Sequence, residues 1–216
     1  MADVGFVDRF VPAHPESGGE AAVSSTLLMP HGTGGDETDL IYLGSKLLSG
    51  ASLLSPRGKV LEHGMPRFFR RLADGVFDLE DLKLRTRELA GFIEEAKRAY
   101  RLRGNIIAVG YSNEANIAAS LILLHPGILA RAILFRAMVA LVPDGAPNLN
   151  GTRFLLARAR RDHIASPTQT LRLFEMFQTA GADVDIHWHE GCHELGQDDI
   201  DAARKWVTTP DNNRVH

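Results

Sequence analysis

The sequence predicts an α/β fold, a mostly parallel sheet of about seven strands with helices on both faces. Strand-like and helix-like stretches alternate from about residue 23 onward, which is the pattern of parallel strands joined by helical crossovers. The 216 residues are enough for one continuous core without stabilising crosslinks. We therefore expect residues 1–216 to form a single domain.

Short apolar runs rich in β-branched residues are the predicted strands. They span residues 6–11, 23–29, 51–54, 105–110, 132–135, 153–157 and 183–188. The first is expected to form an antiparallel edge of the sheet.

Apolar residues at helical spacing predict a long amphipathic helix over 79–102 and a second over 168–180, and a small-residue helix is expected over 115–124. Two connections, 55–78 and 137–151, are longer than a compact crossover needs. The first mixes apolar and cationic side chains, so it is expected either to cover a cleft as a small loop cap or lid, or to be a surface loop.

The charge pattern excludes several classes of partner. The formal net charge is −3 and neither sign forms long blocks, so nucleic acid and membrane surfaces are not expected partners. No signal peptide and no membrane-spanning run are visible, and Cys192 is the sole cysteine. We expect a cytoplasmic protein that acts on a small molecule.

The segment Gly110-Tyr111-Ser112-Asn113-Glu114 lies between a predicted strand and a predicted helix. It matches the G-x-S-x-G nucleophile elbow of serine hydrolases except at Glu114, where the pattern has glycine. The serine of such an elbow is a nucleophile in a strained conformation. Ser112 is the candidate nucleophile; alternatively, it only caps the helix that follows.

A nucleophilic serine needs a histidine base and an acid that orients the base. In open α/β hydrolases the acid precedes the histidine, and each follows a later strand. Asp162 and His193 fit this order. The competing acids Asp144, Asp183 and Asp185 lie before the relevant strand or in or beside the next one.

The loop His31-Gly32-Thr33-Gly34-Gly35 follows an early strand, and its glycines let backbone N–H groups approach a substrate. We predict an oxyanion hole from the N–H groups of Thr33 and Asn113. The loop lacks the Gly-Lys-Ser/Thr ending of a phosphate-binding loop and the spacing of a dinucleotide fingerprint, so we do not expect it to bind a nucleotide.

The histidines and the cysteine near residue 190 suggest two further arrangements. His187 and His189 share one face of a predicted strand and suggest a metal site with His193, but no acidic ligand cluster accompanies them. Cys192 is beside His193 and so suggests a thiol nucleophile, but it is not on an elbow. We expect no metal and no cofactor.

Together these motifs make the chain resemble, nearly end to end, the bacterial phospholipase/carboxylesterase family of α/β hydrolases, especially the branch associated with hydroquinone breakdown. The matching pieces are His31-Gly32-Thr33-Gly34-Gly35-Asp36-Glu37, Ser55-Pro56-Arg57-Gly58, Gly64-Met65-Pro66-Arg67-Phe68-Phe69, Gly110-Tyr111-Ser112-Asn113, Ala132-Ile133-Leu134-Phe135-Arg136-Ala137-Met138 and His193-Glu194-Leu195.

The resemblance implies a cofactor-independent serine esterase for small carboxylic or aryl esters, often a homodimer, with Ser112, Asp162 and His193 as catalytic triad. The residues expected to line the substrate pocket are Gly32, Gly34, Met65, Phe68, Phe69 and Met138. An acyl-thioesterase or lysophospholipase acting on longer acyl chains is an alternative with the same triad.

Departures from the family pattern cluster around the predicted site. They are Glu114 and Cys192 in place of glycines, and Ala140, His163 and Ser166 in place of prolines. We expect Glu114 to lie in the first turn of the helix, to point outward and to modulate the activity. The competing hypothesis is a degenerate homologue that binds a ligand without turning it over.

Overall fold

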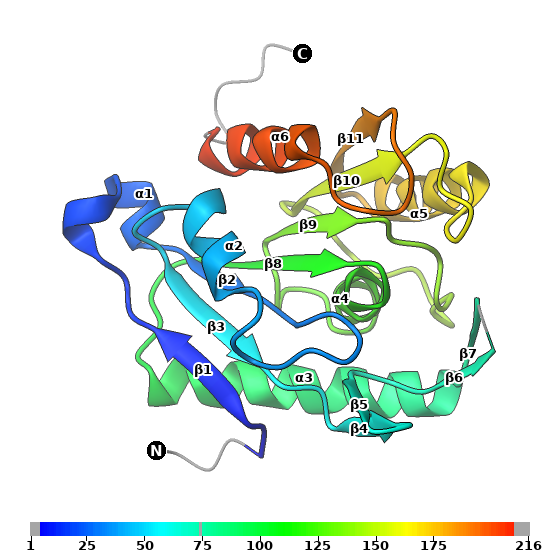
Figure 1. Cartoon of the computed structure of the whole chain (residues 1–216), viewed down its shortest axis with the longest axis horizontal. Coiled ribbons are helices and arrows are strands. Elements are labelled where there is room, and N and C mark those ends of the chain that lie inside the picture. Colours follow the sequence, from blue (N-terminus) through cyan, green and yellow to red (C-terminus); the bar gives the residue numbers. More distant parts are fainter. Residues whose placement is uncertain (1–4, 74, 210–216) are drawn as a thin grey trace.

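The computed structural model describes residues 5–73 and 75–209 and contains the predicted sheet (Figure 1). Its strands lie in the order β1-β3-β2-β8-β9-β10-β11, and every neighbouring pair is parallel except β1 with β3 at one edge. The fold class and the antiparallel edge strand are therefore confirmed. The strands are β1 Asp8–Val11, β2 Thr26–Leu28, β3 Ser52–Pro56, β8 Ile106–Tyr111, β9 Arg131–Phe135, β10 Arg153–Ala159 and β11 Asp183–His189.

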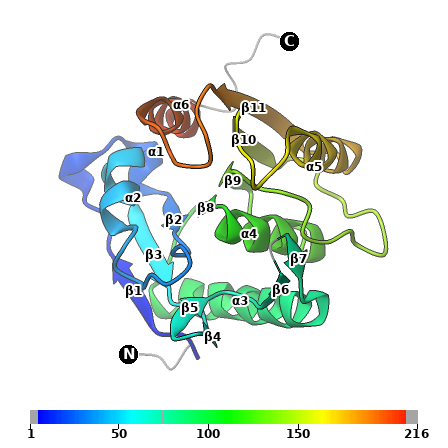
Figure 2. The same ribbon diagram turned by 45° about the vertical axis from the view of Figure 1, so that its right-hand side comes forward.

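Helices cover both faces of the sheet, as Figure 2 shows. One face packs against α3, α4 and α5, and the other against α2 and α6, with the short α1 beside them. Their bounds, with a short 3-10 turn η1, are η1 Pro15–Ser17, α1 Glu20–Val23, α2 Ile41–Leu47, α3 Leu79–Ala99, α4 Asn113–Leu124, α5 Pro167–Thr179 and α6 Gln197–Thr208.

The central strands are apolar throughout because each face of the sheet is buried. Successive side chains of β9 point to opposite faces, so Ala132 and Leu134 join the core under α3, α4 and α5, while Ile133 and Phe135 join the core under α2 and α6. Burial on both sides explains why these strands appear in the sequence as continuous apolar runs.

The structure corrects some predicted boundaries. Val23 ends helix α1 instead of beginning a strand, and β2 starts at Thr26. The sequence patterns did not predict α2 or α6. Helix α6 carries a usable signal, since its buried Ala203, Trp206 and Val207 recur at helical spacing.

The connection from β3 to α3 is not a plain loop. Its first two residues, Ser55 and Pro56, belong to β3. The rest, which we call the strap (residues 57–73 and 75–78), forms two small antiparallel hairpins. These pair β4 Val60–Glu62 with β5 Met65–Arg67, and β6 Arg71–Ala73 with β7 Val76–Phe77. The connection expected to be a loop is thus built partly from short strands, and its role as a cap over a cleft remains a prediction.

No helix in the described part of the chain is long and apolar enough to cross a membrane.

Candidate active site

Ser112 stands at the turn between β8, in the middle of the sheet, and α4. Its backbone has φ 55° and ψ −115°, which is strained for a residue with a side chain and is the conformation expected of a nucleophile elbow. Gly110 makes the turn possible: a Cβ there would lie 2.7 Å from the backbone of Glu114 and Ala115. The local chain therefore folds as the sequence predicted, despite Glu114.

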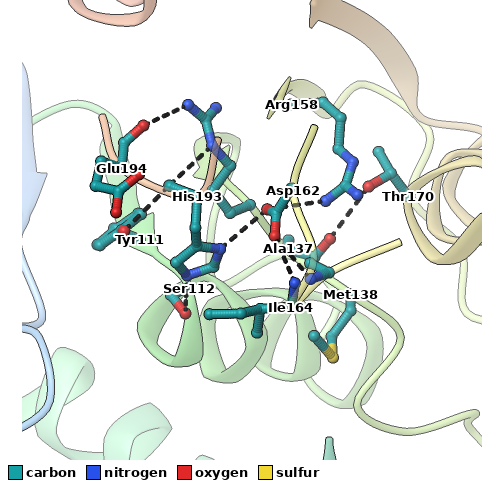
Figure 3. Close-up of polar contacts among 12 residues, drawn as sticks. Tyr111, Ser112, Ala137, Met138, Arg158, Asp162, Ile164, Thr170, His193 and Glu194 are labelled. Carbon is teal, nitrogen blue, oxygen red and sulfur yellow. Dashed lines mark hydrogen bonds and ion pairs between the residues drawn. The ribbon is translucent and has the colours of Figure 1, made fainter. Parts of the chain in front are cut away.

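Ser112, His193 and Asp162 form a continuous hydrogen-bonded chain (Figure 3). The Oγ of Ser112 is 2.9 Å from Nε2 of His193, and Nδ1 of His193 is 2.9 Å from Oδ2 of Asp162. The three residues follow β8, β11 and β10, all at the carboxyl edge of the sheet, where ligands of open α/β folds bind. The structure thus brings together the three residues predicted to act jointly.

Asp162 is held as a carboxylate. Its Oδ1 accepts the N–H groups of Ile164 at 2.8 Å and Ala165 at 3.0 Å. Burial alone would raise the pKa of Asp162, but the hydrogen bonds from Ala165, His193 and Ile164 outweigh it and hold the pKa below its ordinary value. A charged Asp162 fixes Nδ1 of His193 as a donor and leaves Nε2 to face Ser112.

Two residues with no predicted role also contact this chain. Nη1 of the fully buried Arg158 lies 3.4 Å from Oδ2 of Asp162, the same oxygen that faces His193. The hydroxyl of Tyr111 donates to the carbonyl oxygen of His193 at 3.1 Å. The sequence does carry a signal for Arg158, because this arginine lies within an otherwise apolar run, where a charged residue is unusual.

The glycine loop after β2 is fastened to the strap. His31 is fully buried: its Nε2 accepts the N–H of Gly58 at 2.9 Å, which makes Nδ1 the donor to the carbonyl of Gly32 at 2.7 Å. Gly34 has φ +81°, a conformation that favours glycine, and its N–H donates to Pro66 at 2.9 Å. The strap therefore sets the shape of this loop.

The predicted oxyanion donors lie at the same edge of the sheet. Asn113 opens α4, so its N–H is among those without an acceptor inside the helix. Thr33 is exposed on the loop that follows β2, the strand paired in parallel with β8. Their assignment to an oxyanion hole remains a prediction.

Glu114 does lie in the first turn of α4, but the expectation that it points outward is wrong. Only 1% of the residue is exposed, because its side chain is packed inside, within the electrostatic reach of Arg67 and Arg71 of the strap. Burial raises the pKa of Glu114 to about 8, although its own N–H and the two arginines oppose that shift. Near pH 7 this carboxyl is mostly protonated.

The residues predicted to line a pocket differ in their exposure to solvent. Met65 is 40% exposed, and its side chain lies over Gly34. Met138 is buried, and its N–H donates to Asn116 at 2.9 Å. Phe68 and Phe69 are buried within the core under α3, and their role as pocket residues remains a prediction. Phe68 still lies near the site, with its ring 5.1 Å from that of His31.

The competing acids and histidines have other surroundings. Asp185 accepts the indole N–H of Trp206 at 2.7 Å, and Asp144 is exposed. His189 contacts Asp198. Among the described residues, His189, Asp198 and Asp199 lie close enough together to be potential metal ligands. Asp199 is already paired with a buried arginine, and this group does not include His193.

Comparison with known proteins agrees with this fold. No family model matches the chain. MhqD of Bacillus subtilis (strain 168), provisionally named a hydrolase, is 43% identical over 183 residues, which are 84% of this chain and 92% of that protein. A carboxylesterase of Bacillus cereus has 40% identity, a TM-score of 0.89 and 95% coverage of both chains. One from Mesorhizobium loti has 30% identity, a TM-score of 0.87 and coverage of 97% and 98%.

The fold and these similar proteins define an α/β hydrolase that acts on esters. The chain belongs to the bacterial family of MhqD and these carboxylesterases, the phospholipase/carboxylesterase type.

Proposed function

We propose that this protein is a serine carboxylesterase that hydrolyses small carboxylic or aryl esters through an acyl-enzyme intermediate on Ser112. The observation that carries the proposal is the chain from Ser112 through His193 to Asp162, with both hydrogen bonds at 2.9 Å. Within the hydrolase family this arrangement supports a Ser-His-Asp triad.

In the first half-reaction, Oγ of Ser112 attacks the ester carbonyl while Nε2 of His193 takes its proton. Asp162 stabilises the imidazolium, and the N–H groups of Asn113 and Thr33 bind the oxyanion. His193 then returns the proton to the leaving alcohol as the C–O bond breaks. Water repeats the sequence on the acyl-enzyme, releases the acid and regenerates Ser112. Side chains and backbone supply every step, so we invoke no metal or cofactor.

A fluorophosphonate probe followed by peptide mapping tests this proposal. We expect the probe to label Ser112, and Ser112→Ala to abolish both labelling and hydrolysis of nitrophenyl acetate. Ser120→Ala is the matched control, because Ser120 is a buried serine on the same helix whose hydroxyl donates to the carbonyl of Asn116. An unlabelled Ser112 in a folded protein would overturn the proposal and favour a ligand-binding homologue.

Glu114 is the departure that most directly challenges turnover. We propose that its burial as a mostly neutral group makes it compatible with hydrolysis. Glu114→Gly restores the usual elbow sequence and should change substrate preference or rate by a modest factor. An inactive parent and an active variant would show that this residue disables the enzyme.

A series of nitrophenyl esters of increasing acyl length identifies the substrate class. We expect kcat/KM to be highest for short chains. A maximum at long chains, or preference for a thioester of the same acyl group, would instead support a lysophospholipase or acyl-thioesterase.

A further inference from the structure

Arg136 is the residue immediately after β9, and its backbone is strained. Its φ is +57°, a conformation that non-glycine residues adopt only where the surrounding structure imposes it. The N–H of Arg136 donates to the carbonyl of Ala157 on the neighbouring strand at 2.9 Å. The strained backbone directs a fully buried guanidinium toward the loop that carries His193.

One side of this guanidinium binds Asp199 in the first turn of α6. Nη1 is 2.9 Å from Oδ1 of Asp199 and Nη2 is 2.6 Å from Oδ2, a two-pronged ion pair with both partners fully buried. Oδ2 of Asp199 also accepts the N–H of Gly196 at 3.0 Å. These bonds fix the end of the His193 loop to the start of α6.

The remaining donors of Arg136 reach the backbone of the base itself. Nε donates to the carbonyl oxygen of His193 at 3.1 Å, and Nη2 donates to that of Glu194 at 2.9 Å. Tyr111 donates to the same carbonyl of His193. A buried ion pair needs only the carboxylate of Asp199, so the two bonds to the loop point to a further role.

We propose that Arg136 is a positioning residue for the reaction, one that holds His193 between Ser112 and Asp162 by binding its main chain. It touches none of the reacting atoms. Rotation of His193 about its own main chain would lengthen one of its two 2.9 Å hydrogen bonds, so a fixed carbonyl keeps both in place. A displacement of about 1 Å at such a group costs roughly a hundredfold in rate. The inference rests on the proposed triad.

Arg136→Lys is the informative variant, because lysine keeps the charge opposite Asp199 and loses the planar fork. We expect a kcat lower by about 10- to 100-fold, an almost unchanged KM and slower probe labelling of Ser112 by the same factor. Arg153→Lys is the matched control. Arg153 is also buried with aspartate partners but lies at the opposite end of the strands, so kcat should stay within about twofold of the parent.

A double-mutant cycle separates positioning from mere stability. In a His193→Ala background no base remains to be positioned, so we expect Arg136→Lys to cause no further loss of residual activity. Equal losses in both backgrounds, or an unchanged kcat for the single variant, would overturn the inference. If Arg136→Lys does not fold, the pair Arg136→Met with Asp199→Leu removes both buried charges together and should show the same fall in kcat.

Failure of the proposed esterase function would give a different result from failure of the proposed role of Arg136. In that case Ser112 would not be labelled in the parent protein and Ser112→Ala would leave hydrolysis intact. With the triad established and the cycle additive, only the role of Arg136 fails.

Discussion

Two buried carboxyl groups flank the candidate nucleophile, and their surroundings drive them to opposite charge states. Both oxygens of Asp162 have partners, namely two N–H groups on Oδ1 and His193 with Arg158 on Oδ2. Glu114 lies on the side of the strap, and its Oε1 has no hydrogen-bond partner. The pKa of Asp162 is lowered, whereas burial raises that of Glu114 to about 8.

Burial and hydrogen-bond donors together account for this difference: burial is the largest influence on the pKa of Glu114, whereas the hydrogen bonds to Asp162 outweigh the effect of its burial. A carboxylate with several donors stays charged and orients the base. A carboxyl with too few donors holds its proton. Glu114 therefore occupies a glycine position without placing a full negative charge beside the nucleophile at neutral pH, which is how the altered elbow remains compatible with the proposed chemistry.

Removing the charge of Asp162 should have the largest effect. Asp162→Asn keeps the size of the side chain and removes the carboxylate that stabilises the imidazolium, so we expect kcat to fall by roughly 10³- to 10⁴-fold. Nitrophenyl acetate hydrolysis measures it, with the melting temperature as a folding check. Asp144→Asn at an exposed site is the control and should be silent. A loss below tenfold would remove Asp162 from the proposed triad.

The next prediction concerns stability and Glu114. Its pKa is about 8 in the folded protein and near 4.5 when unfolded, so the folded state binds the extra proton between these pH values. The contribution of protonated Glu114 to the free energy of unfolding is therefore fully present below about pH 4.5, and it is lost as the pH rises to about 8. We expect the parent to lose a few kcal/mol relative to Glu114→Gln between pH 5 and 8.5.

Urea unfolding of both proteins at each pH measures this difference. Glu80→Gln is the control: Glu80 is an exposed glutamate in the first turn of α3, and the variant should follow the parent at all pH values. Parallel stability curves for the parent and Glu114→Gln would show that Glu114 ionises normally, and the contrast with Asp162 would disappear.

Arg158 tests the other carboxyl. Its positive charge, 3.4 Å from Oδ2 of Asp162, reduces the electrostatic stabilisation that this carboxylate gives to an imidazolium. For Arg158→Met we expect the acid limb of the kcat/KM profile to move to higher pH by up to about one unit. Arg158→Lys should move it less because the charge remains. A shift to lower pH would contradict this reading.

The smallest effect is expected where the glycine loop meets the strap at the surface. Arg57 binds Glu37 through two hydrogen bonds, but the pair is partly exposed and solvent weakens it. Arg57→Met should lower kcat/KM by about fivefold or less, and the difference should vanish in 1 M salt. A larger, salt-independent loss would mean that this pair shapes the oxyanion loop.

Much of the site could be predicted because its parts follow local rules. The elbow at Gly110 and Ser112 is a short-range turn between a strand and a helix, and the order of Asp162 and His193 after later strands places both at one edge of a parallel sheet. The strap was less predictable, because strands of two or three residues leave almost no periodic signal.

The sequence by itself determined the fold class, the elbow and the chain order of the three candidate catalytic residues, since periodicity and turn chemistry act between near neighbours. Only the tertiary structure decided that Glu114 is buried and that Arg136 binds a carboxylate 63 residues away. Burial and long-range pairing depend on which elements pack together. That packing is the reason why the carboxyl of Glu114 holds its proton near neutral pH while that of Asp162 remains charged.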